Sequence, residues 1–276
     1  MKTFAEQLLF PNVVIDKKRL QRKISGKTIV ITGASYGIGE QLALLFSTYD
    51  VHLILIARTT QRLKLLASII EENGSRCSYI IANLYKENEV SLVIEELQKF
   101  TNIDIFISNA GKSITRPLTE SLNRYHDFTR TNSLNYLAPV KMLLAATPMI
   151  ACSNGHIVNV SAMNVLLLPA PKWAAYQASK TAFDQWFRSN LAEWRIMGIQ
   201  AKTIYLPLVR TGMIASNKNY AHYPAMQPQQ AAIRIAALIC SSDNRSKPWW
   251  AIFAQAGTFV GRTIWERHSY NHLKRK

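Results

Sequence analysis

Short apolar runs alternate with longer helical patterns between residues 28 and 206. Each run is rich in Ile and Val and is continuously apolar, rather than alternating between apolar and polar positions. This pattern is typical of strands that are buried on both faces of a parallel sheet. The predicted strands are residues 28–32, 51–57, 77–82, 103–107, 156–161 and 199–206.

The segments between these runs are helical in pattern, and alternation of this kind predicts an α/β protein. We expect a doubly wound Rossmann fold, with one central parallel sheet, helices on both faces and right-handed crossovers. No internal repeat or low-complexity linker divides the chain. We therefore predict one domain over residues 26–244, an N-terminal extension over 1–25 and a C-terminal tail over 245–276. The predicted helices are residues 38–47, 61–72, 88–100, 124–150 and 173–197.

A glycine-rich segment lies between the first predicted strand and the first predicted helix. Gly33 permits a tight turn, Gly37 lets the backbone approach a pyrophosphate, and Gly39 allows the helix to pack closely on the strand. The helix N-terminus offers free N–H groups and the positive end of its dipole to phosphates. A glycine triad also occurs in ordinary loops, but its place between strand and helix favours phosphate binding. The predicted phosphate loop contains Gly33, Ser35, Tyr36, Gly37, Ile38 and Gly39.

Arg58 directly follows the second predicted strand, where an acidic residue would bind the ribose hydroxyls of NAD and repel a phosphate. A guanidinium can instead bind the 2′-phosphate of NADP through two hydrogen bonds. The alternative is a solvated arginine at the end of a strand. We predict NADP(H) as the cofactor.

Tyr176 and Lys180 lie four residues apart in a predicted helix, so their side chains share one face. A free tyrosine has a pKa of about 10 and is a poor acid at neutral pH. We expect the Lys180 ammonium to favour the phenolate and to lower the pKa of Tyr176. The pair predicts an acid catalyst, with a surface Tyr/Lys pair on an amphipathic helix as the alternative.

Four motifs now stand in order along the chain: the phosphate loop, Asn109-Ala110-Gly111, the Tyr176/Lys180 pair, and a segment that ends in Thr211. Each follows a predicted strand, and together they resemble the short-chain dehydrogenase/reductase family over roughly residues 26–240. The match is closest to bacterial fatty acyl-CoA reductases, which reduce long-chain acyl-CoA to aldehyde with NADPH. The segments similar to those enzymes are residues 109–114, 125–128, 134–136 and 207–215.

This resemblance implies an NADP(H)-dependent oxidoreductase that acts on a carbonyl or alcohol, with a lipid-like substrate such as a fatty acyl-CoA, a fatty aldehyde or a hydrophobic ketone. An ordinary ketone reductase or alcohol dehydrogenase, and a cofactor-binding scaffold with weak catalysis, are the alternatives. The resemblance also implies that Tyr176 and Lys180 contact the cofactor, together with residues on several other loops. Those residues are Asn83 and Leu84 on the adenine side, Asn109, Ala110 and Gly111, and Thr211.

Two further catalytic positions follow from the resemblance. Asn135 corresponds to an asparagine that anchors a water in the proton relay, and its context fits the family better than that of Asn132. The family usually has a second serine that binds the carbonyl oxygen, and here Ala162 stands in that position. Either the preceding Ser161 supplies this hydrogen bond, or the site lacks the donor.

The segment 212–228 follows the last motif and mixes apolar with small polar residues. It predicts either a lid over an apolar substrate or an ordinary surface loop. The residues that would line the lid are Met213, Ile214, Tyr220, Tyr223 and Met226.

The net charge of +16 is concentrated at the two ends of the chain. Residues 1–27 hold seven basic and two acidic residues, and residues 245–276 hold seven and one. Apolar side chains accompany these charges, so solvated basic tails and attachment to an anionic membrane surface are both open. The apolar residues are Phe4, Leu8, Leu9 and Phe10 at one end, and Trp249, Ile252, Phe253, Phe259 and Val260 at the other.

Other classes are disfavoured. The three cysteines are far apart, which argues against a zinc site and suits a reducing, cytoplasmic compartment. The sequence contains no nucleic-acid recognition motif, the termini have no apolar stretch long enough to span a membrane, and no signal peptide is predicted. We expect no metal site and no nucleic-acid partner, and the family resemblance implies a homo-oligomer.

Overall fold

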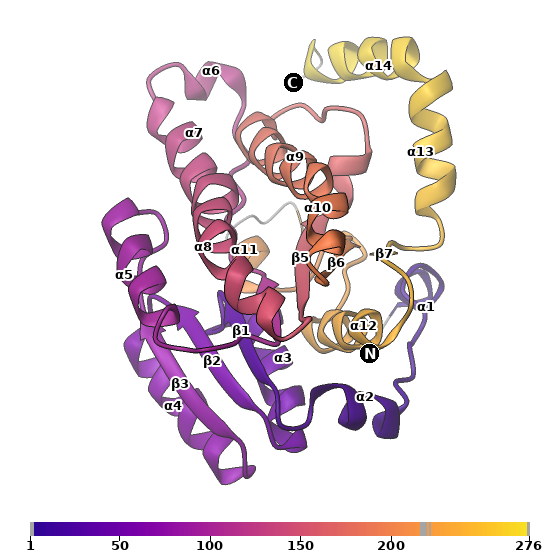
Figure 1. The fold of residues 1–276 in the computed structure, drawn as a ribbon. Helices are drawn as coiled ribbons and strands as arrows, with labels where there is room; N and C mark the ends of the chain where they lie inside the picture. The colour runs from indigo at the N-terminus through magenta and orange to yellow at the C-terminus, as the bar shows by residue number, and fades with distance from the viewer. Residues whose placement is uncertain (1–2, 216–219, 221, 275–276) are drawn as a thin grey trace.

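The computed structural model describes residues 3–215, 220 and 222–274. Seven parallel strands form one sheet in the order β3-β2-β1-β4-β5-β6-β7 (Figure 1). Because the strand order changes direction between β1 and β4, the loops that follow these two strands diverge and open a crevice at the carboxyl edge of the sheet. The strands are β1 (Thr28–Thr32), β2 (His52–Ala57), β3 (Arg76–Ile81), β4 (Ile105–Ser108), β5 (His156–Ala162), β6 (Gln200–Leu206) and β7 (Arg245–Ser246).

Helices cover both faces of this sheet and form two apolar cores. Ile29 and Ile31 of β1 enter the core on one face, whereas Val30 between them enters the core on the other. A strand that is buried on both faces needs a continuous apolar run, which explains the sequence pattern. One face carries α3 (Gly37–Phe46), α4 (Thr60–Glu72) and α12 (Pro228–Cys240), and the other carries α5 (Glu87–Leu97), α8 (Ala138–Cys152) and α9 (Ala174–Ser189).

The predicted fold class is confirmed, with two local differences. The run at 77–82 was expected to be buried on both faces, but it forms the edge strand β3, whose residues are either exposed or half-buried. The predicted helix 173–197 divides at Asn190 into α9 and α10 (Leu191–Ile196). Shorter helical elements are η1 (Ser47–Tyr49), α6 (Leu118–Ser121), η3 (Met163–Leu166) and α11 (Gly212–Ala215).

The predicted helix 124–150 is continuous but not uniform. It consists of α7 (Tyr125–Asn132), a π-helical segment η2 (Ser133–Leu137) and α8. By length and composition it could cross a membrane, with a mean hydropathy of 1.2. Its buried side chains, including Met142 and Leu143, instead form part of the core beside the sheet, which accounts for its apolar composition.

The N-terminal segment packs on the protein, which its basic composition did not indicate. In α2 (Lys17–Ile24), Leu20 and Ile24 are fully buried, and this helix packs against α12. In α1 (Phe4–Leu9), the buried Glu6 accepts a hydrogen bond from Arg210 Nη2 at 2.7 Å. Glu6 therefore joins the start of the chain to the segment after β6.

The C-terminal segment forms an arm of two helices, α13 (Ala251–Val260) and α14 (Arg262–Lys274), drawn in yellow in Figure 1. The arm begins at the buried Ala251 and turns so that Trp265 Nε1 donates a hydrogen bond to the Pro169 carbonyl at 2.9 Å. Ile252 and Phe253 are exposed on α13, whereas the side chains of Phe259 and Val260 lie outside the described part of the chain.

We expect Glu6→Gln to lower the free energy of unfolding by about 2 kcal/mol at pH 7, because hydrogen bonds to charged groups contribute about this much. The Arg210 hydrogen bond and the Ala225 N–H lower the pKa of Glu6 from 4.5 to about 2. A group with a lowered pKa stabilises the fold above its unfolded pKa, so the contribution is present above pH 4.5 and lost as the pH falls toward about 2.

The measurement is denaturant unfolding at pH 7 and at acidic pH. Glu266→Gln is the matched control, because Glu266 pairs with Arg262 on the exposed face of α14 and such pairs contribute little. Equal stability of the wild type and Glu6→Gln at pH 7 would contradict the expectation.

Candidate functional site

The predicted phosphate loop lies between β1 and α3 at the carboxyl edge of the sheet. Gly33 has φ +68° and Gly37 has φ +65°, a left-handed conformation that favours glycine. A Cβ on Gly39 would overlap the carbonyl oxygen of Gly33, so helix and loop are in direct backbone contact. No side chain caps the N-terminus of α3, which leaves its N–H groups available to an anion. Ser35 is buried, Ile38 is half-buried and Tyr36 is exposed beside them.

Asn109 holds this loop in place from the end of β4. Its Nδ2 donates hydrogen bonds to the carbonyls of Thr32, at 2.9 Å, and Gly33, at 3.3 Å. In return, Thr32 Oγ1 accepts hydrogen bonds from the backbone N–H groups of Asn109 and Ala110. The Asn109 amide thus fixes the shape of the loop, and this structural role was not part of the sequence-based prediction.

Basic side chains flank the loop on the side of β2. Arg58 is exposed directly after β2, as the sequence predicted. Arg62, in the first turn of α4, forms an ion pair with Glu40, and its guanidinium carbon lies 4.9 Å from the centre of the Tyr36 ring. The sequence analysis missed Arg62, although its position four residues after Arg58 was a usable signal.

Two further predicted contacts border the same crevice. Asn83 Oδ1 accepts a hydrogen bond from the backbone N–H of Tyr85 at 3.3 Å, and Leu84 is buried between them. Thr211 lies against the phosphate loop, because its Cγ2 would be 2.9 Å from a Cβ on Gly37. The glycine cradle, the free helix N-terminus and the two arginines together fit a dinucleotide with an additional phosphate.

Tyr176 and Lys180 lie on α9, and both are buried. Lys180 Nζ donates a hydrogen bond to the Val160 carbonyl of β5 at 3.2 Å. Burial lowers the pKa of Lys180 to about 8, against a smaller opposite effect of Asp184. Burial also raises the pKa of Tyr176, and the Tyr220 hydroxyl adds to this increase.

The expectation that Lys180 lowers the pKa of Tyr176 is therefore wrong for this structure. Burial disfavours the charged phenolate, and this effect sets the direction in which the pKa of Tyr176 moves. A phenol that stays protonated at neutral pH is the form that a proton donor requires.

Asn135 lies in the π-helical segment η2 and is buried. Its Nδ2 donates to the Lys112 carbonyl at 2.9 Å and to Ser179 Oγ at 3.0 Å, while its Oδ1 accepts from the Lys112 N–H. A Cβ on Gly111 would lie 3.3 Å from Asn135 Oδ1 and 3.4 Å from Lys180 Nζ. The structure thus brings Asn135 beside Lys180, and π segments are often found at functional sites.

Ser161 lies on β5, and its Oγ is buried without a hydrogen-bond partner among the described residues. An unpaired buried hydroxyl costs about 1–3 kcal/mol, and Ser161 Oγ is free to donate a hydrogen bond to a bound molecule. The side-chain amide of Asn164 in η3 is also buried without a hydrogen-bond partner among the described residues. The backbone carbonyl of Asn164 accepts a hydrogen bond from Gln177 Nε2 at 2.7 Å. Gln177 follows Tyr176, so Asn164 is held beside α9; the sequence analysis missed both residues.

Aromatic rings border the site next to Tyr176. The Trp173 ring lies 5.6 Å from that of Tyr176 and 5.8 Å from that of Tyr220. Tyr220, from the predicted lid, is also 3.0 Å from Thr115 Oγ1 through its hydroxyl. Trp173 and Thr115 were not predicted as site residues.

The other residues of the predicted lid differ in burial, and one of them belongs to the core. Met226 is buried in the core and its N–H donates to the Leu208 carbonyl, so it anchors the segment rather than lining a lid. Tyr223 is exposed, whereas Met213 and Ile214 are half-buried. Residues 216–219 and 221 of this segment lie outside the described residues.

Comparisons with known proteins agree with this geometry. Residues 27–221 match the family model described as short chain dehydrogenase. A fatty acyl-CoA reductase of Acinetobacter baylyi is 37% identical over 227 residues, which cover 82% of this chain and 77% of that protein. A fatty acyl-CoA reductase of Mycobacterium tuberculosis is 36% identical over 254 residues, covering 91% and 86%.

Among solved structures, a short-chain dehydrogenase/reductase of unknown function from Caenorhabditis elegans, solved with cofactor, superimposes with a TM-score of 0.71. It is 28% identical, and the match covers 82% of this chain and 94% of that one. The similarity thus extends over the sheet and its flanking helices.

We expect Gly37→Ala to weaken NADPH binding about tenfold or more. A Cβ at this position requires a left-handed conformation that costs about 1–2 kcal/mol, and it would press on Thr211. Fluorescence titration with NADPH measures the affinity. Gly257→Ala is the control, because a Cβ there meets open space in α13. Equal affinities of Gly37→Ala and the wild type would contradict the phosphate-loop assignment.

Proposed function

This chain is an oxidoreductase of the short-chain dehydrogenase family, and from that premise we propose that it reduces the carbonyl group of a lipid-like substrate with NADPH. The first substrate class in this proposal is fatty acyl-CoA. The observation that carries it is the identity of 36–37% to two fatty acyl-CoA reductases over at least 82% of this chain. Arg58 and Arg62, beside the phosphate loop, support NADP(H) over NAD(H).

In this proposal, the cofactor lies across the phosphate loop and the Asn109–Gly111 segment, with its nicotinamide end toward Tyr176. The additional contacts are those of the predicted set: Arg58 with the 2′-phosphate, Asn83 and Leu84 with the adenine, and Thr211 on the nicotinamide side. Bound NADPH would supply the hydride, and every other requirement of the reaction falls to side chains of this chain.

Tyr176 donates a proton to the carbonyl oxygen as the carbonyl carbon gains the hydride. Lys180, charged below a pH of about 8, stabilises the resulting phenolate and holds the ribose. Asn135 anchors a water that returns a proton, and Ser161 donates a hydrogen bond to the carbonyl oxygen. With a thioester substrate, these two additions give a hemithioacetal. Its C–S bond then breaks, its hydroxyl proton passes to the sulfur, and coenzyme A leaves as the thiol, which yields the aldehyde.

We expect Tyr176→Phe to lower NADPH oxidation with a long-chain acyl-CoA by about 10²–10⁴-fold, the usual contribution of a general acid. The assay is the loss of NADPH absorbance, with the aldehyde product identified separately. Tyr79→Phe is the matched control, because Tyr79 lies on the edge strand β3, which β2, β1 and β4 separate from β5 beside the Tyr176/Lys180 pair.

Activity that survives Tyr176→Phe would contradict the assignment of the proton donor. If the wild type is inactive on acyl-CoA but active on ketones or alcohols, the proposed substrate class is wrong. The proposed roles of the catalytic residues are then unaffected. NADPH binding without turnover on any carbonyl compound would support the scaffold alternative.

The proposal also includes a cytoplasmic location with attachment to an anionic membrane surface. Five exposed side chains support it and are called the apolar surface below. Trp249 Nε1 donates a hydrogen bond to the Leu8 carbonyl at 3.1 Å, which joins the exposed side chains of α1 and α13. Lys247, two residues before Trp249, donates a hydrogen bond from Nζ to Gln255 Oε1 on α13 at 2.5 Å, so a basic side chain accompanies these apolar residues, as interfacial binding requires. The apolar surface consists of Phe4, Leu8, Trp249, Ile252 and Phe253.

We expect the protein to partition onto vesicles that contain anionic phospholipid, and the double variant Ile252→Asp/Phe253→Asp to lose most of this binding. Each substitution removes an exposed apolar side chain, 61% and 70% exposed, and adds a negative charge. Ile196→Asp is the control, since Ile196 is 87% exposed on α10. Cosedimentation measures the bound fraction; equal binding of both variants would contradict the proposal.

We further propose that residues 26–244 form the catalytic domain, with residues 1–25 and 245–276 as extensions, and that copies of the chain associate through the long helices. Leu137, the last residue of η2, and Leu144, in the middle of α8, support the association, because they are 51% and 62% exposed. Apolar residues spaced in this way on one helix face are typical of helix–helix interfaces.

A further inference from the structure

A loop after β4 connects the site to a group of charged side chains on its border. The Arg116 N–H donates to the Lys172 carbonyl at 2.8 Å, and Thr115 Oγ1 lies 3.0 Å from the Tyr220 hydroxyl. Lys172 directly precedes Trp173, whose ring lies 5.6 Å from the Tyr176 ring in a tilted arrangement. The backbone of Arg116 is therefore fixed next to the segment that carries Trp173, at the border of the site.

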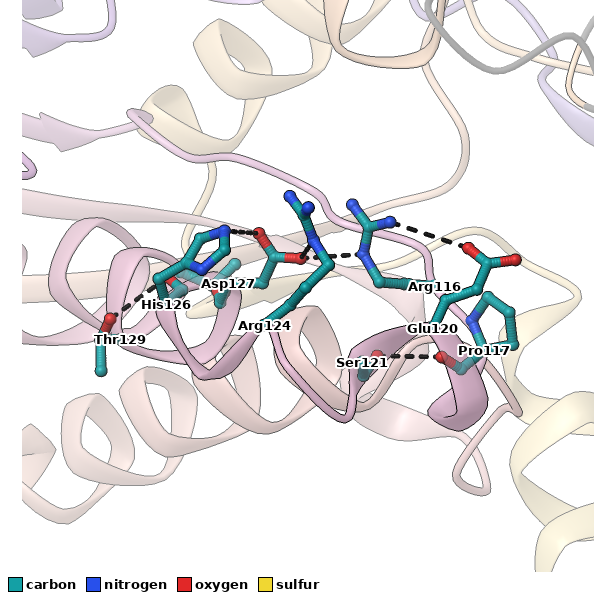
Figure 2. Close-up of polar contacts among 9 residues, drawn as sticks. Arg116, Pro117, Glu120, Ser121, Arg124, His126, Asp127 and Thr129 are labelled. Carbon is teal, nitrogen blue, oxygen red and sulfur yellow. Dashed lines mark hydrogen bonds and ion pairs between the residues drawn. The ribbon is translucent and has the colours of Figure 1, made fainter.

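A buried carboxylate orients Arg116 together with a second arginine. Asp127 Oδ2 accepts hydrogen bonds from Arg116 Nε at 2.8 Å and from Arg124 Nε at 3.1 Å, and His126 Nε2 lies 3.4 Å from its other oxygen (Figure 2). Burial would raise the pKa of Asp127, but the hydrogen bonds from Arg124 and Arg116 hold the pKa below its ordinary value. The carboxylate stays charged and keeps both arginines in place.

Because Asp127 binds the Nε atoms, the terminal nitrogens of both guanidinium groups point away from it (Figure 2). One of them, Arg116 Nη1, lies 3.7 Å from Glu120, whose side chain is 63% exposed. A long contact to an exposed carboxylate is weak and is readily exchanged for another anion. Two adjacent guanidinium forks with fixed bases are well suited to phosphate groups.

The distance from this pair to the reacting groups matches a known chemical spacer. Arg124 is the N-cap residue of α7 and precedes Asn135 by eleven residues along α7 and η2, which corresponds to an axial separation of roughly 16 Å at the 1.5 Å rise per residue of an α-helix. The pantetheine arm of coenzyme A has about thirteen bonds between its sulfur and its first phosphorus. At the ~1.2 Å per bond of an extended chain, it also spans roughly 16 Å.

We propose that Arg116 and Arg124, oriented by Asp127, bind the phosphate groups of the coenzyme A part of the thioester substrate. The inference rests on the proposed function for its choice of ligand. It adds a subsite outside the hydride-transfer site and assigns a role to the Asp127 group. Lys112 and Lys172, at the same rim, add positive charge along the path of the pantetheine arm.

The test measures binding of free coenzyme A by calorimetry, with NADP present at saturation, for the full chain and for Arg124→Gln. We expect Arg124→Gln to weaken coenzyme A binding about tenfold or more, the value for loss of a charge-assisted hydrogen bond. Arg124→Lys keeps the charge but loses the fork, so an intermediate affinity is expected. Turnover of a fatty aldehyde, which carries no phosphate, should be unchanged in both variants.

Arg188→Gln is the matched control. Arg188 Nε also lies near a buried carboxylate, Asp184 at 3.3 Å, and its side chain is 38% exposed against 42% for Arg124. If Arg124→Gln weakens coenzyme A binding no more than Arg188→Gln does, the subsite is overturned.

Failure of the subsite and failure of the proposed function give different results. A wild type that reduces fatty aldehydes but does not bind coenzyme A overturns the subsite and leaves the reductase. Suppose instead that the wild type binds coenzyme A through Arg124 but that none of the carbonyl compounds tested supports NADPH oxidation. This result supports the subsite and overturns the proposed reduction.

Discussion

The hydrogen bonds between Thr32 and Asn109 join the two strand ends on which the rest of the site depends. The strand order of the sheet separates the loops after β1 and β4, and such a crevice keeps its shape only if the two loops are connected. Here the Asn109 amide binds the carbonyls of Thr32 and Gly33, while Thr32 Oγ1 binds two N–H groups of the β4 loop. The left-handed turn at Gly33, the start of α3 and the Gly111 backbone are all positioned by this connection.

Gly111 connects the loop after β4 to Asn135 and Lys180, the side chains that we propose to be catalytic. Its missing Cβ leaves room for Asn135 and Lys180, which would otherwise be pushed apart. Asn135 can reach this point because the π-helical segment shifts the helix locally, and its amide is then fixed by Lys112 and Ser179. Rigid positioning of this kind, in surroundings of low dielectric, strengthens the interactions that a developing charge would feel.

Most of the fold was readable from the sequence because a parallel sheet that is buried on both faces leaves continuous apolar runs, as in β1, β2 and β5. The edge strand β3 showed the same composition but is half exposed, since a run of residues does not reveal which strand lies outermost. The N-terminal helices were missed for a related reason: the many lysines and arginines of α2 hid the two positions, Leu20 and Ile24, that it buries.

The site was predictable wherever a short motif fixes the backbone, as in the phosphate loop and the Tyr176/Lys180 pair. The pKa of Tyr176 was not, because it depends on burial in the folded protein and on the Tyr220 hydroxyl, which is distant in sequence. The same holds for Asp127, which no motif singled out. Its contact with Arg116 arises only when the loop after β4 folds back on α7, whereas Arg124 is three residues away in sequence.

The charged and apolar parts of the molecule are arranged in a way that suits an amphiphilic substrate. An acyl thioester has a hydrocarbon chain that water disfavours and a phosphate-bearing part that an apolar pocket cannot hold. Around Tyr176, the rings of Trp173 and Tyr220 offer apolar contact, while Arg116 and Arg124 lie beyond them at the rim. Asp127 connects these two environments. Its buried carboxylate holds the Nε atoms of both arginines, and their terminal nitrogens point away from it (Figure 2). A substrate that contacts both the aromatic rings and the two arginines would place its carbonyl near Tyr176.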